Sequence, residues 1–444
     1  MDEKSICILG GGLSGLSAGW HLSRKGISAD ILEKEHSAGG LCRSKSVNGF
    51  TFDYDGHLLH CRYPYTFDLL HRRLGVDLVR HVRSAWVYSH GVYCRYPFQA
   101  NLCRLPRAII AECRSGFIEA RRRYSPQKPG PDNFLAWINA RLGTGIAKHF
   151  MVPYNRKFWT VPPSRLNCDW LADFIPVPAI GDFVKGCVRD DRPATRNMGY
   201  NARFWYPRTG GIGRIPEALA RGCPSVHTDC EVKNIDLKKR IIRMRHSRSV
   251  QYDYLISTIP LPDLPRLIPD MPASVRSSFR KLRWNSILNI NLGIDGTPEP
   301  GRHWIYFAQK NIPFFRVGFA HNFSPSLAPA GAGSLYVELS YSARTPLDKR
   351  RAAASSIAHL YSLGILKKKD RILCRDINDI RYGYPLYDRH HREACAAIEC
   401  FLRSHRVIPA GRYGSWKYHS MENAILEGKR AAEEIAALTE GTAA

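Results

Sequence analysis

The fold of this 444-residue chain is decided by its opening stretch, SICILGGGLSGLSAGWHLSRKGISADILEKEHSAGGLCR, which runs from Ser5 to Arg43. It begins with a short apolar run of strand length, and the glycine-rich turn Gly10–Gly15 follows at once. In such a turn Gly10 permits the tight bend, Gly12 lets the backbone approach a pyrophosphate, and Gly15 lets the next helix pack closely. The stretch therefore predicts a strand, turn and helix that bind a dinucleotide.

The residues after the turn complete this unit. We expect a helix from Leu16 to Lys25, ended by Gly26, whose N-terminus offers free N–H groups and a positive dipole end to phosphates. A second strand, from Ser28 to Leu32, is followed by Glu33, 23 residues after Gly10. This is the position of a ribose-binding carboxylate.

The cofactor is indicated by the segment that follows, because NAD and FAD both fit the first turn. Residues 33 to 44, EKEHSAGGLCRS, resemble the second glycine motif of FAD proteins of the amine oxidase, protoporphyrinogen oxidase and UDP-galactopyranose mutase superfamily. In those families this loop runs along the FAD pyrophosphate. By that resemblance the cofactor is FAD.

Composition narrows the class of protein. The chain is 44% hydrophobic and 23% charged, an ordinary globular composition, and it has no run of 18 apolar residues and no signal peptide pattern. Its 13 cysteines are scattered singly, which predicts reduced thiols in the cytoplasm and no metal site. The net charge of +26 leaves open an anionic membrane, a polyanionic small molecule or a plain basic surface, and no nucleic-acid motif is present.

A histidine segment follows the FAD motif. Residues 54 to 60, YDGHLLH, resemble the histidine loop of UDP-galactopyranose mutases, which lies against the flavin ring. His57 and His60 match its two histidines. We expect both to respond to the redox state of the flavin, because the pKa of histidine lies near neutrality.

The resemblance continues into the middle of the chain but breaks at one place. Residues 154 to 159, YNRKFW, resemble the mutase motif that flanks the sugar-nucleotide site, with Trp159 as its tryptophan. Where the mutases carry two arginines, this chain has Phe174 and Pro178. A guanidinium fork is hard to replace at a diphosphate. The bases nearby are Lys185, Arg189 and Arg192.

The remaining candidates lie in the second half of the chain and are implied by the same resemblance. Arg316 and Tyr384 match phosphate-binding positions, Val232 lies in a strand that meets the adenine, and the segment from Ile408 to Tyr418 closes the FAD site before a last helix. The candidate catalytic residues are His57, His60, Trp159, Arg316, Tyr384 and Arg412. The candidate cofactor contacts are Gly10, Gly12, Leu13, Ser14, Gly15, Glu33, Lys34, Gly40, Leu41, Arg43, His57, Val232, Gly411, Arg412, Tyr418, Met421 and Asn423.

These segments predict an α/β fold of two domains. A discontinuous FAD-binding domain of Rossmann type, similar to that of glutathione reductase, comprises residues 1–94, 200–260 and 395–444. A mixed α+β substrate domain, with a helical part and an antiparallel sheet, comprises residues 95–199 and 261–394. Helical spacing of apolar residues also predicts a helix over residues 66–83.

The resemblance implies a mutase-like function. In that family N5 of reduced flavin attacks the anomeric carbon of a nucleotide sugar, and the ring recloses at another size with no net redox change. NADPH or NADH would be the reductant. The sequence leaves open whether the protein forms a homodimer. The alternative is an FAD-dependent oxidase or dehydrogenase of the protoporphyrinogen oxidase or amine oxidase type, which the missing arginines favour. A third possibility is a non-enzymatic protein similar to the Rab GDP-dissociation inhibitors, which share this fold and bind protein partners. The intact glycine turn argues against it.

Overall fold

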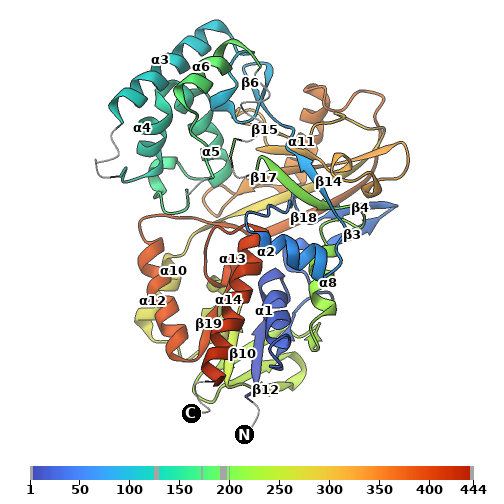
Figure 1. Ribbon diagram of the computed structural model, residues 1–444, viewed down its shortest axis with the longest axis vertical. Coiled ribbons are helices and arrows are strands. Elements are labelled where there is room, and N and C mark those ends of the chain that lie inside the picture. The colour runs from blue at the N-terminus through green and yellow to red at the C-terminus, as the bar shows by residue number, and fades with distance from the viewer. Residues whose placement is uncertain (1–3, 125–129, 172–173, 191–197, 200, 441–444) are drawn as a thin grey trace.

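The computed structural model describes residues 4–124, 130–171, 174–190, 198–199 and 201–440. A five-stranded parallel sheet lies in its lower half in Figure 1. Its strand order is β19-β13-β1-β2-β9. The strands are β1 (Ile6–Leu9), β2 (Asp30–Leu32), β9 (Val226–His227), β13 (Tyr254–Ser257) and β19 (Val407–Pro409). Arg192 lies outside the described residues.

This sheet is covered on both faces, as parallel sheets usually are. Side chains alternate along β1, so that Ile6 and Ile8 face α1 (Leu13–Ser23) and α14 (Met421–Glu440), whereas Cys7 and Leu9 face the opposite core. That second core is closed by a three-stranded sheet and four short or medium helices. Its elements are β10 (Val232–Asp236), β11 (Ile241–Met244), β12 (Ser249–Gln251), α9 (Leu264–Leu267), α10 (Ala273–Lys281), α12 (His391–Ser404) and α13 (Gly411–Gly414).

Helices α1 and α14 run side by side in Figure 1, and their backbones touch where glycines remove the side chains. A Cβ atom at Gly428 of α14 would lie 2.2 Å from the carbonyl oxygen of Ser14. A Cβ atom at Gly15 would lie 1.9 Å from the carbonyl oxygen of Gly10. Only glycine therefore allows α1 to pack this closely against both the first turn and α14.

The second large sheet has seven strands in the order β18-β14-β17-β16-β15-β6-β7. It is mainly antiparallel, and β15 and β6 form its one parallel pair among the described strands. The strands are β6 (Ala85–Ser89), β7 (Val92–Arg95), β14 (Trp284–Asp295), β15 (Trp304–Phe307), β16 (Arg316–Phe319), β17 (Ala332–Tyr341) and β18 (Ile372–Pro385). Helix α11 (Lys349–Ser362) packs on its apolar face.

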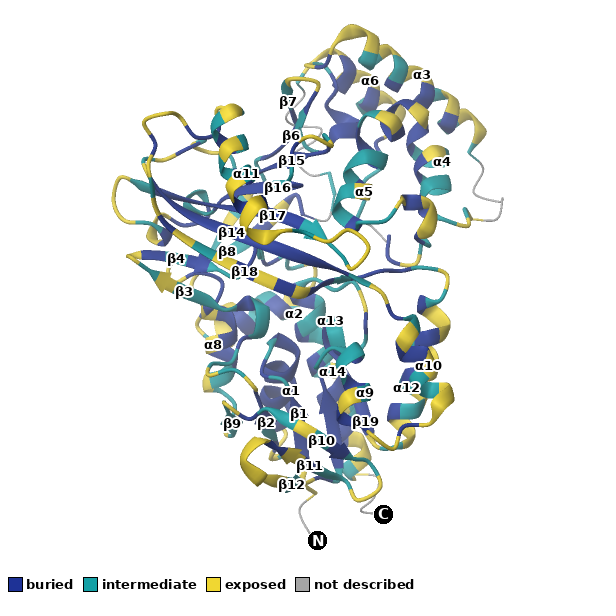
Figure 2. Ribbon diagram, turned by 180° about the vertical axis from the view of Figure 1, so that it is seen from behind, coloured by how far each residue is buried: buried dark blue, intermediate teal, exposed yellow. Residues whose placement is uncertain are grey.

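A helical layer stands over one end of this sheet, and its outer surface is exposed in Figure 2. It consists of α3 (Arg107–Arg123), α4 (Phe134–Ile146), the turn η4 (Ala147–Met151), α5 (Val152–Trp159) and α6 (Ile180–Val188). Smaller elements connect the halves: β3 (Ser44–Val47), β4 (Phe50–Asp53), α2 (Pro64–Phe67), β8 (Arg203–Pro207) and α8 (Arg214–Arg221). Of the helices in the described ranges, none has the length and apolarity to cross a membrane.

The helix expected over residues 66–83 is wrong in its second half. Helix α2 continues through a π-type segment, Asp68–Arg73, and ends before Gly75, whose φ of +67° breaks the helix. Leu78 begins strand β5 (Leu78–Val82), which pairs with β8. The apolar spacing misled because Leu78 is buried as a strand residue. The first helix also begins at Leu13, three residues earlier than expected.

The expected domain boundary at residue 95 falls at the end of β7. Strands β6 and β7 precede that boundary in sequence, yet they pair within the seven-stranded sheet. We keep the division into an FAD-binding and a substrate-binding part as a proposal, with its first boundary moved to residue 84, just before β6.

Because α1 and α14 touch at Gly428, replacing this helical glycine with alanine should destabilise the protein, although alanine is the better helix former. Gly428→Ala should lower the free energy of unfolding by about 1–3 kcal/mol, because the added methyl group overlaps the backbone of α1. Gly181→Ala in exposed α6, where a Cβ atom meets nothing within 4 Å, should be neutral or stabilising by about 0.5–1 kcal/mol. Urea unfolding followed by circular dichroism measures both. Equal stability of the two variants would show that α1 and α14 do not touch.

Candidate active site

A cavity of about 770 Å³ opens at the carboxyl ends of the parallel strands, where Leu9, Leu32 and Thr258 lie. Ligands of open α/β sheets bind at this edge. We call it the large cavity. It is lined by 14 of the candidate cofactor contacts: Gly10, Gly12, Leu13, Ser14, Glu33, Lys34, Gly40, Leu41, Arg43, His57, Val232, Gly411, Arg412 and Met421.

The first turn has the shape that a pyrophosphate needs. Gly10 has a φ of +94°, and a Cβ atom there would lie 2.5 Å from the hydroxyl of Thr258. Gly12 precedes α1 without any side-chain cap, and a Cβ atom on it would meet only Gly40, at 3.9 Å. The N–H groups of the first turn of α1 are therefore open to an anion in the large cavity.

Glu33 directly follows strand β2, lies beside the glycine turn and is buried. Its Oε2 accepts the N–H of Gly11 at 2.7 Å, and its Oε1 accepts the N–H of Glu35 at 2.9 Å. These bonds fix the carboxylate at the wall of the cavity and leave it lone pairs for ribose hydroxyls. The acid, the glycine turn and the size of the cavity together fit FAD.

Three candidate cofactor contacts are not among the residues that line the large cavity. Gly15 faces the packing of α1 on the first turn. Asn423 caps the start of α14, where its side-chain oxygen accepts the N–H and the O–H of Ser420 at 3.1 and 2.7 Å. Tyr418 lies in a group of aromatic rings beside the cavity.

This group, which we call the aromatic wall, consists of Trp159, Tyr384 and Tyr418. Their ring centroids lie 5.4 to 6.1 Å apart. The guanidinium of Arg412, which lines the large cavity, lies 5.2 Å from the ring of Tyr384. The structure thus brings together three of the six candidate catalytic residues, namely Trp159, Tyr384 and Arg412.

Sequence reasoning missed Trp170, which joins this wall at 4.8 Å from Trp159 and 5.8 Å from Tyr418. No motif pointed to it. Phe204, by contrast, packs among His81, His303 and Phe323, and no contact between it and the aromatic wall is recorded among the described residues. The resemblance to the mutases aligns Phe204 with a tyrosine beside the sugar, and this placement stays a prediction.

His57 lines the large cavity and lies 3.3 Å, through Nδ1, from the carbonyl oxygen of Asp55. His60 makes a similar contact with the carbonyl oxygen of Arg203, 3.3 Å from Nδ1, and packs near Phe204. Burial lowers the pKa of each histidine to about 4. The expectation that they titrate near neutrality is wrong, because desolvation of the imidazoles disfavours their charged form.

Arg316 is neither a surface residue nor an open phosphate ligand. It lies directly opposite Glu338 on neighbouring strands, and its Nε and Nη2 both bind the Glu338 carboxylate, with 2.6 Å for Nη2 to Oε1. Glu338, which alternates with apolar residues along β17, is fully buried. It also hydrogen-bonds Asp55, and burial raises the pKa of Glu338 while that of Asp55 is lowered. The guanidinium of Arg316 is therefore already paired with a carboxyl group.

The comparisons with known proteins agree with this architecture. The model of the flavin-containing amine oxidoreductases matches residues 13–436. A 4,4'-diapolycopene oxygenase of Methylomonas is 32% identical over 381 residues, 74% of each chain, and a zeta-carotene-forming phytoene desaturase of Myxococcus xanthus is 23% identical over 75% of this chain and 71% of its own.

Among solved structures, a reduced UDP-galactopyranose mutase superimposes with a TM-score of 0.91 and 28% identity, over 98% of this chain and 96% of its own. A putrescine oxidase with bound putrescine superimposes with a TM-score of 0.68 over 98% of this chain and 99% of its own; at 16% identity it shows the fold alone. The family implies FAD as the cofactor, and the cavity built from Gly10, Gly12 and Glu33 fits it. The chain belongs to the flavin-containing amine oxidoreductase family.

Proposed function

We propose that this protein is an FAD-dependent enzyme that rearranges a nucleotide sugar without net oxidation, with the FAD kept reduced by NADPH or NADH. The proposal is carried by the aromatic wall, which stands next to Arg412, a residue in the lining of the large cavity. It is supported by the likeness to the mutase structure, which extends over nearly the whole chain. Bound and reduced, FAD supplies a nucleophile for the sugar carbon that carries the nucleotide.

The chain's own residues hold the sugar and its phosphates in this proposal. The partly exposed rings of Tyr384 and Tyr418 offer apolar faces to a sugar ring, and buried Trp159 packs behind them. The indole N–H of Trp159 has no hydrogen-bond acceptor within the described structure. The pKa of Arg412 is raised, so its guanidinium stays charged in spite of its burial. It is the positive charge best placed to meet a diphosphate at the wall, because Arg316 is held by Glu338.

His57 acts as a neutral group in this site. With its pKa near 4, the imidazole carries no charge at neutral pH. If Nδ1–H is donated to the carbonyl oxygen of Asp55, Nε2 becomes an acceptor. His57 then orients a neighbouring donor without repelling Arg412.

A second candidate function is the oxidation of an apolar substrate by oxidised flavin. Two observations favour it: Phe174 and Pro178 replace the expected arginines, and Arg316 is already paired. The carotenoid-acting relatives from Methylomonas and Myxococcus point the same way. The aromatic wall suits an apolar substrate as well as a sugar face.

The redox state required for turnover separates these two functions. Dithionite-reduced protein is expected to interconvert the pyranose and furanose forms of UDP-galactose while its flavin spectrum stays reduced, and oxidised protein should be inactive. Anaerobic chromatography of the sugar with parallel flavin absorbance measures both. Bleaching of the oxidised flavin by an amine or a polyene, with no sugar turnover, would instead establish the oxidase.

The aromatic wall is tested by a matched pair of tryptophans. Trp159 and Trp304 are equally buried, and neither indole N–H has a partner in the described residues. Trp159→Phe should weaken binding of UDP-galactose to the reduced protein by about 0.5–1.5 kcal/mol, and Trp304→Phe should leave it unchanged. Titration calorimetry measures the two dissociation constants. Equal losses in both variants would remove Trp159 from the binding site.

Buried histidines also make stability depend on pH. Burial lowers the pKa of His57 and His60 to about 4 and that of His303 and His419 to about 3, against about 6.5 in an unfolded chain. Between these values the unfolded chain binds protons that the folded one does not, so the free energy of unfolding falls as pH decreases from about 6.5.

We therefore expect urea unfolding to show a steep loss of stability between pH 6.5 and pH 4. His303→Asn should reduce this slope by about one proton, or about 1.4 kcal/mol per pH unit, whereas His246→Asn on the exposed surface should not change it. A slope that is the same in both variants would contradict the buried, neutral state of His303.

A further inference from the structure

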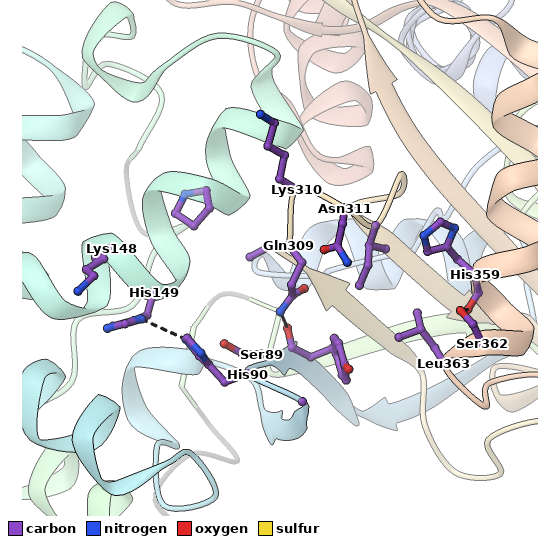
Figure 3. A pocket seen from close by; sticks show the side chains of 15 residues that line it. Ser89, His90, Lys148, His149, Gln309, Lys310, Asn311, His359, Ser362 and Leu363 are labelled. Carbon is purple, nitrogen blue, oxygen red and sulfur yellow. Dashed lines mark hydrogen bonds between the residues drawn. The ribbon is translucent and has the colours of Figure 1, made fainter.

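A second cavity, of about 480 Å³, lies where the seven-stranded sheet, α11 and the helical layer meet, and it shares no lining residue with the large cavity. We call it the second cavity. Figure 3 shows Lys148 and His149 on one side, His359 and Ser362 on the other, and Lys310 and Asn311 between them. Four separate segments of the chain therefore contribute polar side chains to one hollow.

The charge of this hollow is positive. Lys148, Lys310 and the imidazoles of His90, His149 and His359 line it, and none of the described residues in its lining carries a carboxylate. The nearest acid, Glu112, lies behind the wall, where it binds Lys148 and His149 at 2.8 Å each. Lys310 and Asn311 have no side-chain partner in the described part of the chain, so both remain available to a ligand.

Two histidines are aligned by a chain of hydrogen bonds that starts at Glu112. Nε2–H of His149 donates to Glu112 at 2.8 Å, so that Nδ1 of a neutral His149 accepts Nε2–H of His90 at 3.1 Å. This leaves Nδ1 of His90 free to accept from a ligand hydroxyl or, once protonated, to donate to a ligand oxygen. His90 is held in place by the β6–β7 turn, where its φ is +50° and that of Gly91 is +79°.

The loop that carries Lys310 and Asn311 is fixed from behind. Nζ of Lys157 lies 2.6 to 3.1 Å from the carbonyl oxygens of Phe307, Gln309, Ile312 and Phe314, among which it shares its N–H donors. The amide of Gln309 also donates to the carbonyl oxygen of Tyr88, at 2.9 Å. A wall anchored by Lys157 and Gln309 is formed before any ligand arrives, which lowers the entropic cost of binding.

We propose that the second cavity binds a phosphate-bearing small molecule, held by Lys148, Lys310, His90 and Asn311. A phosphate dianion matches the ammonium of Lys310, unpaired among the described residues, together with the N–H donors of His90 and Asn311, and Lys148, whose exposed ammonium also binds Glu112, adds a second positive charge. The hollow has the size of a small-molecule site. The occupant would touch the loop that Lys157 ties to α5, the helix that ends at Trp159.

Titration calorimetry on the FAD-loaded protein tests this proposal, with inorganic phosphate and pyrophosphate as the probes. Both are expected to bind at one saturable site, and the tighter of the two tells whether a monophosphate or a diphosphate is recognised. Lys310→Met removes an unpaired charge, and His90→Asn keeps a residue that tolerates the positive φ. Each should weaken binding about tenfold, or about 1.4 kcal/mol.

Lys239→Met is the matched control, because Lys239 is an exposed lysine in the turn between β10 and β11. It should leave phosphate binding unchanged. Circular dichroism and the flavin spectrum show that each variant folds. No saturable binding of either anion to the folded wild-type protein, or binding that Lys310→Met and His90→Asn both leave intact, would overturn the proposal.

Discussion

The backbone contact of α1 with the first glycine turn is the constraint on which the rest of the structure depends. Any side chain at position 15 would strike the carbonyl oxygen of Gly10, so glycine is needed there. Glycine lets α1 begin close to the end of the first strand, with its first N–H groups toward the large cavity. Gly428 repeats this close approach between α1 and α14. The last helix of the chain therefore packs against the first. Met421, at the start of that last helix, lines the same cavity as Gly10.

The two sheets then divide the work of the proposed enzyme. The parallel sheet supplies a cavity for the nucleotide and the flavin, with Glu33 fixed by two backbone bonds. The seven-stranded sheet supplies Tyr384 at the end of β18 and the buried group of Arg316, Glu338 and Asp55. Arg412, at the boundary between them, is near both the cavity and the aromatic wall.

The glycine turn and its strand, helix and acid were predictable because each residue there has a local reason, namely φ, helix packing or a spacing. Fourteen candidate contacts therefore line one cavity, and that they contact FAD stays a prediction. Contacts made across sheets were not predictable. Glu338 alternates like a solvent-facing residue, and only the register of β16 and β17 shows that Arg316 lies opposite it. The pKa of His57 likewise depends on packing that no motif encodes. Leu78 has helical spacing, yet Gly75 turns the chain into a strand.

The central claim is that FAD extends through the large cavity from Glu33 to Arg412, and flavin stoichiometry tests it most directly. The absorbance of the purified protein before and after denaturation, with identification of the released compound, should give one non-covalently bound FAD per chain. A protein that is colourless, and that stays colourless after incubation with added FAD, would contradict the account.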